Sequence, residues 1–147
     1  GDDFMLIKQI SIFVENKPGR LSNITNILKQ NDIDIRALSI ADTKDFGILR
    51  LIVNDPDKAC NVLKGAECTV TITDVLAVGI SDEPGGLSVV MNTLYNNAIS
   101  VEYMYAFNTH TSGKAHLIFR VTDIKKGAEV LKASDVRLIS QEDLAKL

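Results

Sequence analysis

Hydrophobic and polar positions change their period along the chain, and each change marks a predicted strand or helix. Residues 10–14 alternate between strongly and weakly apolar faces, which is typical of a half-buried strand. Apolar residues then recur at helical spacing over residues 21–28, and this helix is expected to end near Asn31-Asp32. The first half continues with predicted strands at 33–41, 47–53 and 68–73, and with a second helix that begins around Pro56.

The second half of the chain repeats this order of elements. Its apolar periods predict strands at 76–80, 99–107, 115–121 and 136–139, and helices at 87–94 and 124–132. A short terminal helix is expected after Ser140, because an acidic residue follows this serine at the third position. Residues 16–33 align with 82–99 without a gap and share eight identities in 18 positions, so one small unit was duplicated.

Each half therefore has the order strand, helix, strand, strand, helix, strand. Right-handed crossovers turn this order into a four-stranded antiparallel sheet with two helices on one face. The sequence predicts an α+β fold of two ferredoxin-like βαββαβ repeats, with domains at 6–73 and 74–147, the second carrying the short C-terminal helix. A unit of this size is marginal alone and no linker separates the two, so the repeats are expected to pack side by side.

Charge and cysteine content exclude several classes of function. The net charge is −3 and no block of basic residues occurs, so we expect neither a nucleic-acid nor a membrane partner. The chain has no apolar run near 18 residues and no secretory-type start. Cys60 and Cys68 have no zinc-site spacing, which indicates a reduced, cytoplasmic protein without a metal or other cofactor.

The aligned segments share a Pro-Gly turn, which is therefore the first place to look for a function. The turns are Asn16–Leu21 and Asp82–Leu87, and each leads into a helix whose first N–H groups lack intrahelical partners. Those groups and the helix dipole suit a carboxylate. Glycine lets a ligand approach the backbone, and Asn16 or Asp82 could accept a hydrogen bond from an ammonium group. The simpler interpretation, a turn that only starts a helix, stays open at this stage.

The duplicated βαββαβ pattern with D/N-x-P-G-x-L after its first strand resembles the ACT domain family. The resemblance covers about residues 8–73 and 75–139. It implies a regulatory module that binds a free amino acid between two such domains, one contributing the turn and the other the start of its second strand. The expected ligand-binding residues are Asn16, Lys17, Pro18, Gly19, Arg20 and Leu21 with Ile99, Ser100 and Val101, and Asp82, Glu83, Pro84, Gly85, Gly86 and Leu87 with Ile33, Asp34 and Ile35.

The chain departs from the family pattern at three points. Asn16 stands where aspartate is commoner, so the site built around Asp82 is expected to bind an ammonium group more strongly. Asp32 and Ala98 stand where a glycine often precedes the second strand. ACT modules are usually fused to an enzyme and none is visible here, so we expect a free-standing sensor or regulatory subunit, with an enzyme of amino-acid metabolism as a possible partner.

Two other functions stay open. One is a partner subunit whose ligand sites are vestigial. The other is an enzyme of ferredoxin-like fold, for which the available groups are Asp34, Asp82, Glu83, Glu102, His110 and His116. No catalytic constellation is evident, so a non-enzyme is predicted.

Self-association is also predicted. Tyr103, Tyr105 and Phe107 share one face of a predicted strand, whereas Leu38, Ile40 and Met104 place apolar residues on the other faces of these strands. The helix-free face of an antiparallel sheet can be solvated only when it is polar. We therefore expect a homodimer that covers this surface.

Overall fold

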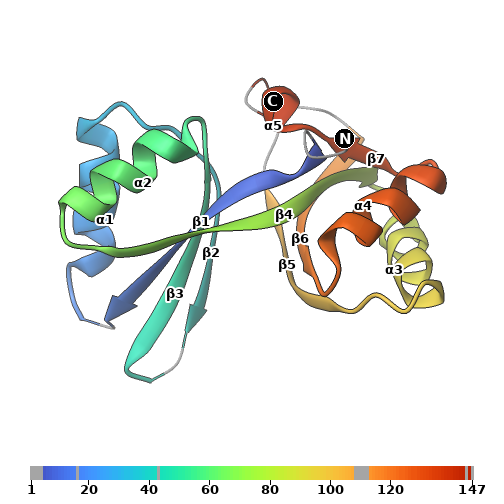
Figure 1. Ribbon diagram of the computed structural model, residues 1–147, viewed down its shortest axis with the longest axis horizontal. Coiled ribbons are helices and arrows are strands. Elements are labelled where there is room, and N and C mark those ends of the chain that lie inside the picture. Colours follow the sequence, from blue (N-terminus) through green and yellow to red (C-terminus); the bar gives the residue numbers. More distant parts are fainter. Residues whose placement is uncertain (1–4, 16, 43, 108–112, 145, 147) are drawn as a thin grey trace. The chain divides into compact units, whose positions relative to one another are not determined.

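The computed structural model describes residues 5–15, 17–42, 44–107, 113–144 and 146 of the 147-residue chain (Figure 1). The chain divides into two compact units. The first repeat is Lys8–Thr73, and the second repeat is Asp74–Leu147 together with the segment that ends at Ile7. Each repeat is described by itself.

The first repeat is a four-stranded sheet with two helices. Its strands follow the order β2-β3-β1-β4, and β3 pairs antiparallel with both β1 and β2. The helices α1 and α2 lie side by side (Figure 1). In chain order the elements are β1 (Ile7–Glu15), α1 (Arg20–Gln30), β2 (Ile35–Asp42), β3 (Phe46–Val53), α2 (Pro56–Gly65) and the first part of β4 (Thr69–Ser81).

The second repeat has the same topology, with strand order β7-β4-β6-β5. Its strand pairs β4–β6, β5–β6 and β4–β7 are all antiparallel. The elements are the second part of β4, α3 (Gly86–Asn96), β5 (Val101–Phe107), β6 (Lys114–Val121), α4 (Ile124–Ala133), β7 (Arg137–Ile139) and the terminal helix α5 (Gln141–Leu144). The predicted α+β fold of two βαββαβ repeats is confirmed.

The sequence predicted a break between strands where the structure has none. The sequence predicted two strands at 68–73 and 76–80, whereas β4 is a single strand from Thr69 to Ser81. No glycine or proline interrupts Val70–Val78, and Thr73-Asp74 alone does not break an extended backbone. The terminal helix was predicted correctly, including its cap, since Asp143 N donates to Ser140 Oγ at 3.1 Å.

Each repeat has its own hydrophobic core between the sheet and its two helices. In the first repeat Ile10, Ile12 and Val14 of β1 meet Ile24 and Leu28 of α1, as the two periods of the sequence predict. The core of the second repeat has an aromatic centre, Phe119, which is fully buried. It is surrounded by Leu76, Val78, Val90, Leu94, Ile99, Leu117, Val121, Ala128 and Leu131.

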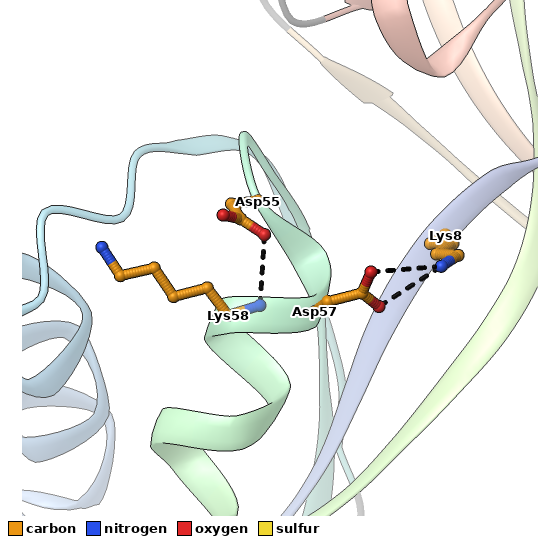
Figure 2. Close-up of polar contacts among 4 residues, drawn as sticks. All are labelled: Lys8, Asp55, Asp57 and Lys58. Atoms are coloured by element: carbon orange, nitrogen blue, oxygen red, sulfur yellow. Dashed lines mark hydrogen bonds and ion pairs between the residues drawn. The ribbon is translucent and has the colours of Figure 1, made fainter.

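The second helix of each repeat begins with an aspartate cap. Asp55 accepts a hydrogen bond from Lys58 N at 3.1 Å (Figure 2), and Asp123 accepts one from Lys126 N at 3.1 Å. Such a cap stabilises a helix by about 1 kcal/mol. Figure 2 also shows Asp57 of α2 facing Lys8 of β1 with Nζ–Oδ1 at 3.3 Å, an exposed ion pair that contributes little.

Each of the helices α1 to α4 is followed by a residue with left-handed backbone, two positions after the last helical residue. These residues are Asp32, Glu67, Ala98 and Asp135, with φ between 57° and 64°. After α1, Ile33 N donates to Leu28 O at 2.9 Å, and after α3, Ile99 N donates to Leu94 O at 2.9 Å. These are Schellman bonds, which usually accompany glycine at the left-handed position. The turn geometry is thus kept although glycine is absent there.

Candidate ligand-binding turns

Both Pro-Gly segments form type II turns. Arg20 N donates to Lys17 O at 3.3 Å across the first turn, and Gly19 has φ 84° and ψ −8°. Gly86 N donates to Glu83 O at 3.1 Å across the second, and Gly85 has φ 92° and ψ −10°. A type II turn takes proline at its second position and needs positive φ at its third, which explains the Pro-Gly pair.

The helices that follow these turns begin without a side-chain cap. Gly19 and Gly85 occupy the N-cap positions of α1 and α3, and neither helix start has a side-chain cap hydrogen bond from a described residue. This differs from α2 and α4, which both begin with an aspartate cap. Neither α1 nor α3 has an acidic residue in its first turn. The two N-termini therefore keep their partial positive charge for a group from outside the repeat.

The side chains at the turns are largely exposed. Leu21 and Leu87 are 41% and 38% exposed, and Lys17, Pro18, Asp82, Glu83 and Pro84 are exposed as well. An ordinary Cβ at Gly19 or Gly85 would meet no atom within 4 Å, so the space in front of both glycines is open. A ligand could reach the main chain there.

The two turns differ in their charged groups. Lys17 Nζ lies 2.8 Å from Glu15 Oε2, and this hydrogen bond and charge hold the pKa of Glu15 below its ordinary value. Asp82 is exposed, and its backbone N donates to Gly113 O at 3.2 Å. Asn16 lies outside the described residues. The expected advantage of Asp82 over Asn16 in binding an ammonium group therefore stays a prediction.

The starts of the second strands are held by a reciprocal pair of hydrogen bonds. Asp34 N donates to Asn54 Oδ1 at 2.9 Å, and Asn54 N donates back to Asp34 O at 3.1 Å. In the second repeat, Ser100 N donates to Thr122 Oγ1 at 3.2 Å, and Thr122 N donates to Ser100 O at 3.0 Å.

These bonds take the place of ladder pairing at the start of each strand. Strands β2 and β5 accordingly begin at Ile35 and Val101, two residues later than predicted. Both strands also shift register just after their first residue, as strands often do beside functional sites. Sequence reasoning missed Asn54 and Thr122, although each directly precedes an aspartate helix cap.

One predicted segment lines a cavity. Ile33, Asp34 and Ile35 border a hollow of about 490 Å³ at the C-terminal end of α1. Lys29 and Asp32 also line it, so groups of both signs face the hollow. Asp34 Oδ2 lies 3.3 Å from Arg36 Nε.

Within one repeat, the turn and the second-strand start lie at opposite ends of the same helix. Helix α1 has 11 residues and separates Gly19 from Ile33, a length of roughly 16 Å at 1.5 Å per residue. One free amino acid cannot contact both ends. The pairing of each turn with the other repeat's second strand stays a prediction, because each repeat is described by itself.

Of the two histidines, the structure describes His116. His116 is buried, and its ring centroid lies 5.3 Å from that of Phe107. Burial lowers the pKa of His116, and Arg137 and Lys114 lower it further. His110 lies outside the described residues. In the described part of the chain, no three His, Cys, Asp or Glu side chains gather as a metal site, and no described helix is long and apolar enough to span a bilayer.

A duplicated ferredoxin-like βαββαβ unit with a Pro-Gly turn before its first helix defines the class of tandem ACT proteins. The model of the ACT domain pair family matches residues 5–147. The chain belongs to this family, which confirms the resemblance seen in the sequence.

Solved structures agree with this assignment. A protein from Bacteroides thetaiotaomicron is 43% identical, with a TM-score of 0.92, and the match covers 97% of this chain and 98% of that one. The regulatory subunit of aspartate kinase from Thermus thermophilus has a TM-score of 0.63 at 13% identity, covering 90% and 95% of the two chains. The regulatory subunit of aspartate kinase from Thermus flavus has a TM-score of 0.62 at 14% identity, and the match covers 86% of this chain and 88% of that one. These last two share the fold. The sequence matches none of the curated proteins.

Proposed function

We propose that this protein is a free-standing regulatory protein that binds a free amino acid at its Pro-Gly turns. The observation that carries the proposal is the contrast between helix starts. Helices α2 and α4 are closed by aspartate caps, whereas α1 and α3 begin at an exposed glycine with no cap from a described side chain. Membership of the ACT domain pair family supports the same conclusion.

The chemistry of the turn fits an amino acid. The carboxylate would accept hydrogen bonds from N–H groups in the first turn of α1 or α3 other than Arg20 N and Gly86 N, which close the type II turns. The helix dipole also favours a negative charge there. The ammonium would lie near the turn's acceptors, and the carboxylate of Asp82 makes the second turn the stronger candidate. Open space before Gly19 and Gly85 allows the ligand to approach the backbone.

A regulatory rather than catalytic role follows from the same groups. Backbone donors and a turn can hold an amino acid, but they supply neither a nucleophile nor a base of tuned pKa. We propose a cytoplasmic protein, since Cys60 and Cys68 are both free thiols. We further propose an enzyme of amino-acid metabolism as the partner that the bound state regulates, by analogy with the aspartate kinase regulatory subunits that share the fold.

A thermal-shift screen against the twenty amino acids tests the proposal. A ligand that binds only the native state at 100 times its Kd adds about 2.7 kcal/mol of stability. Calorimetry with the best ligand then compares Gly85→Asn and Gly19→Asn with the unmodified chain. Asparagine tolerates a left-handed backbone, and its side chain would enter the open space before each turn.

We expect Gly85→Asn to weaken binding more than Gly19→Asn. Valine at position 85 would be a poor probe, because a β-branched residue at φ 92° strains the turn itself. If no amino acid shifts the melting temperature, or if neither asparagine variant changes the affinity, the turns only start helices.

A second candidate is a partner subunit with vestigial ligand sites. It is favoured by exposed apolar side chains on the sheet of the first repeat, where Phe13, Phe46 and Ile48 are 48%, 45% and 38% exposed. Such a subunit would show no response to any amino acid in the screen. Substitution of Phe13 would still change the oligomeric state of such a subunit.

A further inference from the structure

The second repeat contains a cavity of about 260 Å³ at an edge of its sheet. Strand β7 pairs with β4 only over Ala77–Gly79, so it does not reach Ile80 and Ser81. The cavity opens at this part of β4, beside the first turn of α3 and the residues that lead into β7. It lies within one repeat, and its lining includes Gly86 but not Gly85.

Two glycines, Gly79 and Gly86, lie in the wall of this cavity. A Cβ at Gly79 would lie 3.6 Å from the His116 ring and 3.8 Å from Cδ of Arg137, which also lines the cavity. Gly86 brings the start of α3 against β4, since a Cβ there would overlap the Ser81 carbonyl oxygen. In the first repeat the aligned positions hold Phe13 and Arg20. The wall of the cavity thus differs from the first repeat at both aligned positions.

Two cationic side chains line the cavity from strands on both sides of β4. Lys114 of β6 is the register partner of Ser81, and Arg137 of β7 is the register partner of Gly79. Both residues are exposed, and neither side chain forms an ion pair or hydrogen bond with another described residue. Their combined positive field reaches His116, whose pKa they lower in addition to the effect of burial.

A single carboxylate completes the set of charges. Asp135, at the left-handed position after α4, also lines the cavity. The site thus presents two positive groups and one negative group around a space of about 260 Å³. Liquid water takes about 30 Å³ per molecule, so this volume corresponds to about nine water molecules. A small amino acid has about the same number of non-hydrogen atoms.

We infer that this cavity binds an acidic amino acid. The two ligand carboxylates lie at Lys114 and Arg137, and the ligand ammonium lies at Asp135. Charge-assisted hydrogen bonds of this kind are shorter and stronger than neutral ones. A neutral amino acid would leave one cation without a partner, and a dicarboxylate without an ammonium would leave Asp135 facing a like charge.

Calorimetry with L-glutamate and L-aspartate tests the inference. The variants are Lys114→Gln, Arg137→Gln and Asp135→Asn, and the matched control is Lys125→Gln, which removes an exposed charge from α4 outside the cavity. Because these side chains are exposed, the variants are expected to keep the fold, which circular dichroism verifies. We expect one molecule bound per chain and a loss of about tenfold in affinity for each cation removed, equivalent to about 1.4 kcal/mol.

The ammonium contact has its own test. Asp135→Asn should weaken the binding of L-glutamate but not the binding of glutarate, which has the two carboxylates without the ammonium. No binding of either acidic amino acid at millimolar concentration would overturn the inference, as would equal affinities for Arg137→Gln and Lys125→Gln.

The outcome separates this cavity from the Pro-Gly turns. Gly85→Asn should leave the binding of L-glutamate to the cavity unchanged. If Gly85→Asn abolishes that binding and Arg137→Gln does not, the ligand lies at the turn. In that case the present inference fails and the proposed function stands.

Discussion

The rings of Phe13 and Phe46 stack with their centroids 5.1 Å apart and their planes inclined by 28°. Both lie on the helix-free face of the first repeat, since Phe13 alternates with the core residues Ile12 and Val14. Ile48 is the register partner of Phe13. These three exposed side chains, the Phe13 patch, form a contiguous apolar surface of the kind that marks an association site.

We predict that the chain forms a dimer through the Phe13 patch. Light scattering at micromolar concentration should give a mass near twice the formula mass of 16.1 kDa. Phe13→Ser should shift the mass toward the monomer while the circular dichroism spectrum is kept, because Phe13 lies outside the core. Tyr95→Ser, which removes a side chain that is 82% exposed on α3, is the control. A monomeric unmodified chain would contradict the prediction.

Replacing Ala98 by glycine should stabilise the protein. A left-handed backbone costs a non-glycine residue roughly 1–2 kcal/mol, whereas glycine loses roughly 0.5–1 kcal/mol more conformational entropy on folding. At φ 58° the strain is the larger effect, so we expect a gain of about 0.5–1 kcal/mol in urea denaturation. Gly19→Ala, at φ 84°, should change stability by a similar amount in the opposite direction. Loss of stability in Ala98→Gly would show that this end of α3 is held by other contacts.

The second position after proline should tolerate substitution in one repeat and not in the other. In Gly86→Ala the new methyl group would overlap the Ser81 carbonyl oxygen, which is backbone and cannot rotate away. We expect a loss of about 1–3 kcal/mol, as for other overpacked sites. The aligned residue is Arg20, and Arg20→Ala should cost clearly less, since a Cβ is already present there. Thermal denaturation measures both losses of stability. Equal losses in the two variants would contradict the prediction that the Ser81 carbonyl restricts position 86.

His116 should make stability depend on pH. Its folded-state pKa is lowered, first by burial and then by Arg137 and Lys114, so the unfolded chain binds more protons as pH falls through the ordinary histidine pKa. Stability should therefore decrease between pH about 7.5 and about 5.5, the range in which histidine titrates. His116→Gln should reduce this decrease. Arg137→Gln should raise the pKa of His116 in an NMR titration, and an unchanged pKa would show that the guanidinium is too distant or too well screened to act.

Most of the fold could be predicted from the sequence, because the period of a strand, the period of a helix and the Pro-Gly turn each occur in both repeats. The alternation around Ile10 and the spacing around Ile24 identified β1 and α1, and Pro18-Gly19 identified the turn that joins them. The strand starts at Ile35 and Val101 were predicted two residues early. That error arose because apolar alternation does not reveal that Asp34 and Ser100 bond to side chains of Asn54 and Thr122.

The candidate turns could be predicted locally, but the cavity of the second repeat could not. A Pro-Gly pair specifies its own backbone, so Gly19 and Gly85 could be placed in positive φ from the sequence. The cavity instead lies where β7 stops pairing with β4, which local sequence patterns do not reveal. Arg137 and Asp135 come from a distant part of the chain, and only the folded sheet brings them to the first turn of α3.

The contact between Gly86 and the Ser81 carbonyl also bears on how the duplicated gene can change. Repeated sequences within a gene tend to become alike, because recombination copies one repeat onto the other. Copying the first turn into the second would place arginine at position 86, where even its Cβ overlaps the main chain. Such a product would carry the same overlap as Gly86→Ala, so we expect it to be less stable than the present chain. The two copies of the turn are therefore not interchangeable, although both belong to the same repeated unit.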